Sequence, residues 1–322
     1  MNYLNKLPKP FFVLAPMDDV TDTVFRQVVA DCARPDVFFT EFVNVDGLQS
    51  PGRANLLKKL QNTAKEQPLI AQIWGLKPES FYKTAQQIIA GEFGKFAGID
   101  LNMGCPIQTV IKNGACSGLI NNRELAAEII KATQEGAAGK LPVSVKTRLG
   151  FNEIDLSWHE FLLKHDLSML TIHGRTRKEM SKVPAHWQTI GEVRKLRDKL
   201  APKTLIVGNG SVLTLADGLE LAQKYQLDGI MIGQGILQDP FLFAEESPWE
   251  NYSREQKLKL YEKHVQLYAK TRQPDKRRIH TLNKFCKIYI NGFDGAKELR
   301  EQLMAAESST ELLSLLDSAS LS

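Results

Sequence analysis

Short apolar runs alternate with amphipathic helical segments eight times between residues 11 and 237. The runs are continuously apolar, as expected of parallel strands that are buried on both faces. Eight strand–helix repeats within about 245 residues predict a (β/α)₈ barrel, that is a TIM barrel, with a doubly wound sheet as the competing interpretation. The predicted strands cover residues 11–17, 37–43, 68–75, 98–104, 142–150, 169–176, 204–211 and 229–237.

The strand signal stops after Pro240, and Pro248 marks a hinge. From Ser253 onward the pattern is helical, and glycines interrupt it near residue 292. The sequence therefore predicts an α/β chain of two domains, a barrel over residues 1–245 and a small all-helical C-terminal domain over residues 250–322.

Composition excludes several classes of protein. No run of 18 apolar residues exists, which argues against a membrane span, and the N-terminus lacks the pattern of a signal peptide. The cysteines are scattered without a CxxC pair, which argues against a disulfide framework or a zinc knuckle. We therefore expect a cytoplasmic monomer that does not contact a membrane. The four cysteines are Cys32, Cys105, Cys116 and Cys286.

Positive charge is concentrated near the C-terminus. The net charge is only +4, yet residues 254–300 contain 13 Lys or Arg and 5 Asp or Glu. A local basic patch suits a polyanion, although on charge alone an ordinary solvated helical face is the favoured explanation.

Polar residues recur at the carboxyl ends of the predicted strands, where barrel enzymes build their active sites. Each polar group buried without a partner costs about 1–3 kcal/mol, so their repetition at one end favours a ligand site. The residues at these ends include Asp18, Thr40, Glu41, Gln72, Asn102, Cys105, Lys146, Arg148, His173, Arg175, Asn209 and Gln234.

The glycine-rich ends of strands seven and eight predict a phosphate site. They read Gly208-Asn209-Gly210 and Gly233-Gln234-Gly235, and barrels often bind phosphate through backbone N–H groups there. Lys146 could stabilise negative charge on the ligand, and Gln72 or Asn102 suits a ring with donors and acceptors on one edge. Clustered metal ligands are absent, so we expect no metal. Flavin mononucleotide (FMN) fits this set, and other phosphorylated ligands stay open.

Several motifs together resemble the tRNA-dihydrouridine synthase family of the bacterial type, flavin enzymes that reduce uridines in tRNA. The most specific are "GIDLNMGCP" at 98–106 and "IHGRTR" at 172–177. The others are "LAPMDDVTD" at 14–22, "TEF" at 40–42, "AQIWG" at 71–75, "PVSVKTRLG" at 142–150, "VGNGSV" at 207–212 and "GIMIGQGIL" at 229–237.

The resemblance implies NADPH-dependent, FMN-mediated reduction of the uracil C5=C6 bond to 5,6-dihydrouridine. Gln234 departs from the family, which often has arginine there, and such differences leave the target uridine open. The residues expected to bind FMN are Pro16, Met17, Asp18, Gln72, Asn102, Lys146, His173, Gly208, Asn209, Gly210, Gly233 and Gln234.

The resemblance also implies that Cys105 is the catalytic acid, delivering a proton to C5 while hydride from flavin N5 reaches C6. A cysteine with the ordinary pKa of about 8.5 is mostly thiol at neutral pH and can donate a proton. Gly104 and Pro106 would hold the turn that carries it. The other three cysteines, Cys116 included, are expected to be structural.

A uridine in folded tRNA must be turned out of its stack to reach the barrel. We expect Arg148 and Arg175 to meet the nucleotide near the flavin, and NADPH to use the same mouth in alternation with tRNA. The helical domain would contact tRNA phosphates. Its candidate residues are Arg277, Arg278, Lys284 and Lys287.

Two other functions remain compatible with these residues. An FMN barrel acting on a free pyrimidine, as dihydroorotate dehydrogenases do, would share the barrel and the phosphate site. It would not need a basic helical domain of about 70 residues. A nucleic-acid-binding protein without activity would not need Cys105 or Lys146.

Overall fold

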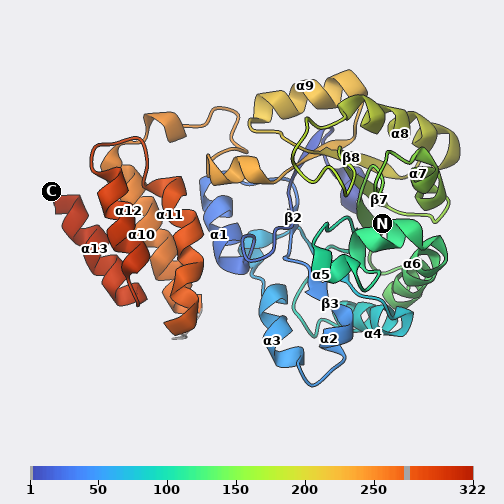
Figure 1. The fold of residues 1–322 in the computed structure, drawn as a ribbon, viewed down its shortest axis with the longest axis horizontal. Coiled ribbons are helices and arrows are strands. Elements are labelled where there is room, and N and C mark those ends of the chain that lie inside the picture. Colours follow the sequence, from blue (N-terminus) through green and yellow to red (C-terminus); the bar gives the residue numbers. More distant parts are fainter. Residues whose placement is uncertain (1–2, 272–275, 322) are drawn as a thin grey trace. The chain divides into compact units, whose positions relative to one another are not determined.

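The computed structural model describes residues 3–271 and 276–321, and only the backbone of 276–278 and 321. Packing divides the chain into two compact units (Figure 1). The first comprises the chain up to Thr23 and Pro35–Gln234. The second comprises Val24–Arg34 and the chain from Gly235 onward.

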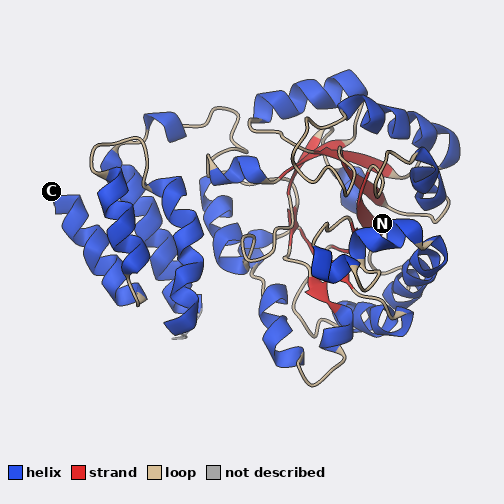
Figure 2. Cartoon of the chain, in the orientation of Figure 1, coloured by secondary structure: helices blue, strands red, loops and turns tan. Residues whose placement is uncertain are grey.

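The first unit is built around one parallel sheet that curves into a barrel (red in Figure 2). Its strand order is β1-β9-β8-β7-β6-β5-β4-β2, and β3 also pairs with β4. A parallel bridge between Val13 and Val37 brings the two ends together, and the amide of Leu14 donates to the carbonyl of Val37 at 3.1 Å. The predicted TIM barrel is thus confirmed. Its strands are β1 (Phe11–Leu14), β2 (Phe38–Phe39), β3 (Val43–Asn44), β4 (Leu69–Trp74), β5 (Gly98–Met103), β6 (Val143–Arg148), β7 (Met169–His173), β8 (Leu205–Asn209) and β9 (Gly229–Ile232).

Two predicted strands differ from the observed ones. The second is split into β2 and β3, and the chain between them turns where the Thr40 hydroxyl donates to the carbonyl of Glu41 at 2.7 Å. The last ends at Ile232 rather than residue 237, because its partner β1 ends there and Gln234–Leu237 forms the 3-10 turn η5.

The inside of the barrel is apolar at one end and polar at the other. Side chains from alternate strand positions point inward, and Phe11, Val13 and Met231 belong to one buried cluster that includes Leu4 of η1 (Tyr3–Lys6). Toward the carboxyl ends the inward positions of β4–β7 become polar. The apolar end of the barrel interior is thus the packed core, and the polar residues gather at the other end.

Amphipathic helices cover the outside of the sheet. The helix at Pro78–Ile89 packs closely against the helix at Arg123–Ala137. This packing depends on Gly136, because a Cβ there would lie 2.5 Å from the carbonyl oxygen of Tyr82. These helices are α4 (Pro78–Ile89), α6 (Arg123–Ala137), α7 (Leu156–Leu163), α8 (Trp187–Leu200) and α9 (Leu215–Tyr225). Shorter elements, among them α5 (Gln108–Ile111) and η4 (Cys116–Asn121), follow β5. The irregular stretch after β3 contains α2 (Val45–Leu48), α3 (Arg53–Leu57), η2 (Lys58–Leu60) and η3 (Ala64–Glu66).

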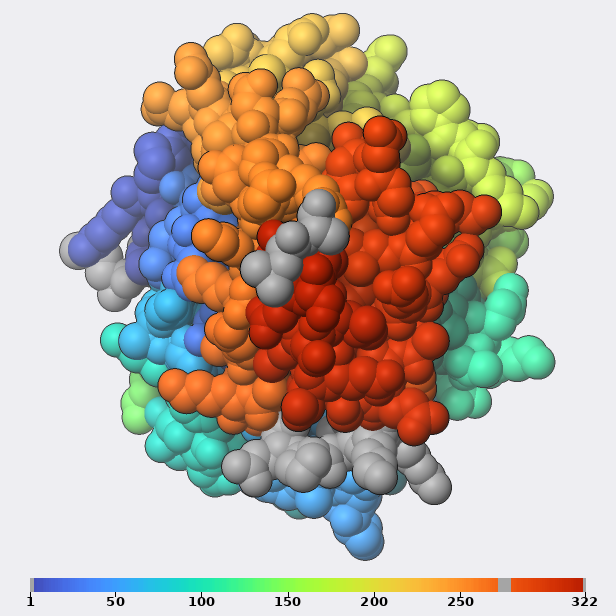
Figure 3. All heavy atoms as spheres, turned by 90° about the vertical axis from the view of Figure 1, so that its left-hand side faces the viewer, coloured from blue at the N-terminus to red at the C-terminus, as the bar shows by residue number. Residues whose placement is uncertain are grey.

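The second unit consists of helices packed through aromatic side chains. Phe25 of α1 (Thr23–Cys32) stacks on Phe285 with ring centroids 4.8 Å apart, and Tyr261 stacks on Tyr289 at 5.0 Å. The sequence pattern places α1 after the first strand but does not reveal that it packs with the C-terminal helices. Those helices are α10 (Arg254–Thr271), α11 (Asn283–Tyr289), α12 (Ala296–Ala305) and α13 (Ser309–Leu321), whose surface is orange to red in Figure 3.

The predicted domain boundaries of 1–245 and 250–322 stay a prediction. Within the described residues, no helix is both long and apolar enough to cross a lipid bilayer.

Candidate active site

A cavity of about 450 Å³ opens at the carboxyl ends of the barrel strands. Its lining also includes Pro106, Ser181 and Ser211. Residues from six separate segments, at or after the ends of β1 and β5–β9, meet there because parallel strands present their carboxyl ends to one side. The predicted site residues that line it are Pro16, Met17, Lys146, Arg148, His173, Arg175, Asn209, Gly210, Gly233 and Gln234.

Three cationic side chains face this cavity. Burial and the neighbouring Arg148 guanidinium lower the pKa of Lys146 to about 8, and burial lowers the pKa of Arg148 to about 10. Burial also lowers the pKa of Arg175. All three carry positive charge at neutral pH, wholly or in large part, so the cavity suits an anionic ligand.

Arg175 and His173 lie in contact with each other in the lining of the cavity. Nη1 of Arg175 lies 3.2 Å from Nε2 of His173, and Nη2 donates to Oγ of Ser211 at 2.5 Å. Burial and the nearby cations hold the pKa of His173 far below its ordinary range, so the imidazole is neutral. Gly210 lies beside them with φ of +137°, where an added Cβ would lie 3.3 Å from Cδ2 of His173.

Arg148 connects two loops above the barrel. Its Nε donates to the carbonyl of Gly104 at 2.8 Å, and Nη1 donates to the carbonyls of Thr176 and Met180 at 3.1 and 3.0 Å. The residue is 8% exposed. Arg148 therefore holds the turn before Cys105 against the segment that follows β7, and its predicted contact with tRNA stays a prediction.

A buried chain of polar side chains lies under the cavity. Asp100 accepts from Oγ of Ser144 at 2.6 Å and from Nε2 of Gln72 at 2.8 Å. Oε1 of Gln72 accepts from Nδ2 of Asn102 at 3.1 Å. Gln72 and Asn102 are thus beside the site but are not among the residues that line the cavity.

Cys105 follows directly from this chain. Oδ1 of Asn102 accepts from the backbone N–H of Gly104 at 3.1 Å and of Cys105 at 3.0 Å. The hydrogen bond from the Cys116 thiol, the Ile107 N–H, and the charges of Arg148 and Lys146 lower the pKa of Cys105 to about 7. The ordinary thiol pKa assumed from the sequence is therefore too high.

Sequence reasoning missed Asp100, which is hydrogen-bonded into the polar chain that leads to Cys105. Asp100 could have been found, because it lies two residues before Asn102 and so on the same face of β5. Cys116 was expected to be structural, and the residue after it, Ser117, donates through Oγ to the carbonyl of Cys105 at 2.8 Å, which brings the two cysteine segments together. Nothing in the spacing of the two cysteines indicates this contact.

Besides Gln72 and Asn102, two further residues expected to bind the cofactor lie outside the cavity lining, namely Asp18 and Gly208. Asp18 forms an ion pair with Lys59, and Asp18 and Asp19 lie in an acidic cluster with Glu41 whose ligand atoms are within 4.8 Å of one another. Gly208 faces α8, because a Cβ there would lie 2.4 Å from the Trp187 ring. Their roles in binding stay predictions.

The predicted tRNA contacts of the second unit are partly described. Lys284 and Lys287 are exposed on α11, and their spacing of three residues puts them on one face of the helix. The backbone of Arg277 and Arg278 lies in η7 (Lys276–Leu282). The side chains of Arg277 and Arg278 lie outside the described residues.

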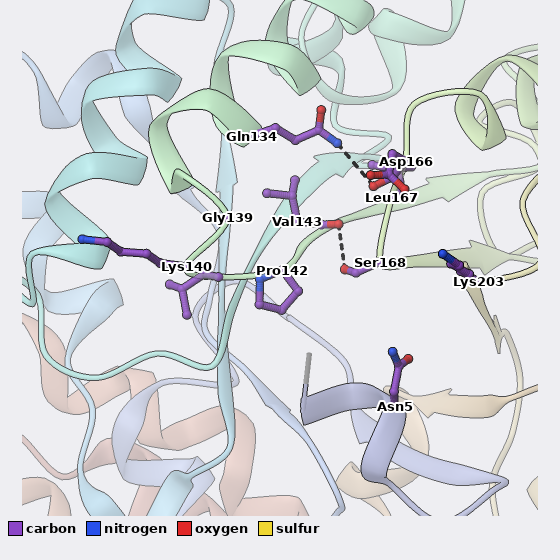
Figure 4. Close-up of a pocket in the computed structure, with 11 residues that line it drawn as sticks. Asn5, Gln134, Gly139, Lys140, Pro142, Val143, Asp166, Leu167, Ser168 and Lys203 are labelled. Atoms are coloured by element: carbon purple, nitrogen blue, oxygen red, sulfur yellow. Dashed lines mark hydrogen bonds between the residues drawn. The ribbon is translucent and has the colours of Figure 1, made fainter. Parts of the chain in front are cut away.

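A second cavity, of about 470 Å³, lies at the amino ends of β6 and β7 (Figure 4). Two of its polar side chains already form hydrogen bonds within the protein: Gln134 donates to the carbonyl of His165 at 2.7 Å, and Ser168 donates to the carbonyl of Val143 at 2.7 Å. Lys140 and Lys203 at its rim are exposed. TIM-barrel enzymes place their active sites at the carboxyl ends of the strands, so this cavity is not a candidate active site.

Comparison with known families decides what kind of barrel this is. Residues 13–322 match the family described as "Dihydrouridine synthase (Dus)". The chain belongs to the dihydrouridine synthase family. The resemblance identified from the motifs is thus confirmed, as is the prediction of an enzyme of this family.

Relatives of this dihydrouridine synthase family chain match it along nearly its whole length. A "Probable tRNA-dihydrouridine synthase" of Staphylococcus aureus (strain COL) is 50% identical over 319 residues, covering 98% of this chain and 95% of that protein. A "Probable tRNA-dihydrouridine synthase 2" of Bacillus subtilis (strain 168) is 50% identical over 320 residues, covering 98% and 96%.

Solved structures that resemble this dihydrouridine synthase family member share its fold. Morphinone reductase in complex with tetrahydroNAD has a TM-score of 0.51 at 12% identity, covering 76% of this chain and 91% of that one. At this identity the likeness concerns the barrel alone.

Proposed function

We propose that this chain is a tRNA-dihydrouridine synthase that uses bound FMN and NADPH to reduce the C5=C6 bond of uridines in tRNA. The observation that carries the proposal is the cationic cavity at the carboxyl ends of the strands, with the Cys105 turn beside it. Family membership favours this function over reduction of a free pyrimidine.

The residues present fit FMN. The neutral His173, Arg175 and Ser211 form a polar end for the phosphate, and Gly210 leaves there the space that a Cβ would fill. Lys146 lines the same cavity and supplies a cation there. Buried Oγ1 of Thr171, on the strand beside Lys146, has no hydrogen-bond partner among the described residues, although Thr171 does not itself line the cavity.

When bound, reduced FMN would supply the hydride that is added to C6 of the uracil. Cys105 then breaks its S–H bond and gives the proton to C5, keeping the electron pair on Sγ as a thiolate. Asn102 holds the backbone of this turn through two N–H groups, and Arg148 holds it through the carbonyl of Gly104. Lys146 and Arg148 stabilise the thiolate by their charge.

The substrate contacts follow from charge and exposure. We propose that Arg175, at the cavity wall, and Arg148 meet the nucleotide side of the site, and that Lys284, Lys287, Arg277 and Arg278 meet tRNA phosphates. NADPH would bind transiently at the mouth of the same cavity, before tRNA.

The test is reconstitution with purified components. The protein is loaded with FMN and incubated with NADPH and an unmodified tRNA transcript, and dihydrouridine is measured by mass spectrometry of the digested nucleosides. Dihydrouridine that appears only with all three components supports the proposal. A protein that takes up no FMN, or that reduces free uracil or orotate but not tRNA, would refute it. Mapping the modified position would identify the target uridine.

A further inference from the structure

The loop between β7 and α8, residues 174–186, forms part of the wall of the active-site cavity. We call it the β7–α8 loop. Its two ends meet, because the N–H of His186 donates to the carbonyl of Gly174 at 2.7 Å. Met180 and Ser181, in the middle of the loop, line the cavity. A compact loop of this kind, closed at its base, is frequently a functional element.

Two buried arginines fasten this loop to the barrel. Nη1 of Arg148 donates to the carbonyls of Thr176 and Met180 at 3.1 and 3.0 Å, and Nε of Arg175 donates to the carbonyl of Val183 at 2.5 Å. Arg148 is 8% exposed and Arg175 is 5% exposed. Because hydrogen bonds from a charged donor are stronger than neutral ones, the backbone of the loop is held firmly against the barrel.

The fastened loop carries positive charge that the protein does not neutralise. Its one acid, Glu179, is already engaged, since Oε1 lies 2.9 Å from Nε2 of His186 and Oε2 accepts from the N–H of Thr176 at 2.7 Å. Besides Arg175, the loop has three cations, and none of them forms an ion pair with a carboxylate in the part of the chain that the structure describes. Two of the three are exposed and the first is half-buried. They are Arg177, Lys178 and Lys182.

Arg177 is held in place while its hydrogen-bond donors stay open. Its Cζ lies over the ring of Phe151, 4.9 Å from the centroid, and its backbone N–H donates to the carbonyl of Gly150 at 2.9 Å. Nε of Arg177 is buried and has no hydrogen-bond partner among the described residues. A guanidinium that is positioned in advance, with its donors unused, suits a phosphate, which can accept two parallel N–H bonds.

The chemistry of the substrate brings phosphates to this loop. A uridine that enters the cavity stays attached to its ribose and to the phosphates on either side. Because the base occupies the inside of the cavity, those phosphates must lie around its mouth. The β7–α8 loop forms part of that mouth, and its charge is opposite to theirs.

We propose that the β7–α8 loop is a tRNA contact on the first unit: Arg177, Lys178 and Lys182 bind the phosphates next to the target uridine, and the two buried arginines hold the loop in position. The inference rests on the proposed function, because it requires a uridine of tRNA to enter this cavity. It adds a contact beside the reacting base to those of the helical unit.

The first test measures the salt dependence of tRNA binding. Binding of an unmodified tRNA transcript to the FMN-loaded protein is measured at several salt concentrations, in wild type and in the loop variant Arg177→Gln/Lys178→Gln/Lys182→Gln. Thermal melting shows whether each variant is folded. The matched control removes the same charge from exposed positions of α8 and α9. This control is Lys195→Gln/Lys199→Gln/Lys224→Gln.

The loop variant should lose up to three phosphate contacts. The salt slope should then fall by about 2–3 units, at about 0.7–0.9 per contact, and binding at physiological salt should weaken by more than about tenfold. The control variant should keep the slope of wild type. Arg177→Lys should also keep the slope, because the charge remains, although its affinity should be lower because a lysine lacks the forked donors.

A second measurement locates the contact. The phosphates flanking the target uridine, once that uridine is mapped, are replaced by methylphosphonates, which carry no charge. This tRNA should bind wild type more weakly than ordinary tRNA does. The loop variant should bind the two tRNAs equally, because the groups that would contact these phosphates are already gone.

Two results would overturn the proposal. One is a salt slope in the loop variant that falls no further than in the control variant. The other is an additive loss of affinity when the loop variant meets the methylphosphonate tRNA, since additivity means that the loop and these phosphates do not interact. A wild type that binds tRNA as expected but forms no dihydrouridine would instead refute the proposed function, because the binding measurements need no turnover.

Discussion

Asp100 accepts a hydrogen bond of 2.8 Å from Nε2 of Gln72, and this contact sets the direction of the amide chain beneath the active site. Because Nε2 faces the carboxylate, Oε1 of Gln72 must face Asn102, whose own oxygen is then turned toward the N–H of Cys105. A buried carboxylate thus orients the turn that carries the proposed acid.

Removing the Asp100 carboxylate should destabilise the barrel. Asp100→Ala leaves the Ser144 hydroxyl and the Gln72 amide without their acceptor in a site that is 0% exposed, and should lower the free energy of unfolding by about 2–4 kcal/mol. Asp100→Asn should cost less because an amide oxygen can still accept. Urea denaturation measures both, with the exposed Glu220→Ala as control. A loss in Asp100→Ala no larger than in this control would contradict the role.

The same carboxylate predicts a pH dependence of stability. Burial raises the pKa of Asp100 to about 6, so folding favours its protonated form. The stability that this protonation adds to the folded state is fully present below about pH 3.9, the ordinary pKa of an aspartate in the unfolded chain. It is lost as the pH rises through about 6. Between pH 4 and 6 the stability of Asp100→Asn should therefore rise relative to wild type. Parallel curves across this window would show that the Asp100 carboxyl is not perturbed.

Cys105→Ala should separate the two half-reactions. The variant should retain FMN and oxidise NADPH, while formation of dihydrouridine should fall by about 10²–10⁴-fold because only proton delivery is removed. Stopped-flow flavin absorbance measures the first reaction and nucleoside mass spectrometry the second. Equal dihydrouridine formation in mutant and wild type would rule out the acid role.

The pH profile of tRNA reduction should follow the ionisation of Cys105. Because the neighbouring donors and cations lower the pKa of this thiol to about 7, the proton-bearing form is lost above that pH. Single-turnover reduction of tRNA should decline about tenfold per unit on the alkaline side. The rate of flavin reduction by NADPH, measured on the same samples, serves as the control. A flat profile between pH 7 and 9 would argue for another proton donor.

Lys146→Ala should weaken the hold on FMN or slow hydride transfer. Loss of a charge-assisted contact corresponds to about a 10- to 100-fold change in a binding constant. Flavin retention during dialysis and transient kinetics test the two possibilities. The matched control is Lys140→Ala at the opposite end of the barrel. Unchanged retention and unchanged rate would mean that Lys146 does not contact the flavin.

The basic residues of the helical unit should govern tRNA binding and leave flavin chemistry intact. Neutralising the four proposed contacts should weaken binding by more than about tenfold and lower the salt slope by up to about 3 units, at about 0.7–0.9 per contact. Filter binding across salt concentrations measures this. The proposed contacts are Arg277, Arg278, Lys284 and Lys287.

A control neutralises four exposed lysines on the first unit, Lys195, Lys199, Lys203 and Lys224. If both quadruple variants bound tRNA equally, with equal salt slopes, the helical unit would not be the tRNA platform. NADPH-driven flavin reduction should stay near wild type in both, because neither set lines the cavity.

The barrel, and many of the residues that line its cavity, could be predicted from the sequence alone. Parallel strands buried on both faces must be apolar, so the alternation of apolar strands and amphipathic helices is visible in the sequence. Inward polar residues such as Lys146 and His173 are then recognisable at the strand ends. The motifs around Asn102 and Cys105 were enough to identify the family.

Which groups meet from distant parts of the chain could be learned only from the folded structure. The packing of α1 with the C-terminal helices depends on Phe25 reaching Phe285, and a helical pattern does not say which partner its apolar face will meet. The acidity of Cys105 likewise depends on the loop that brings Cys116 back to it and on the charges of β6. A pKa is set by burial and neighbours in space, and the order of residues along the chain does not contain those distances.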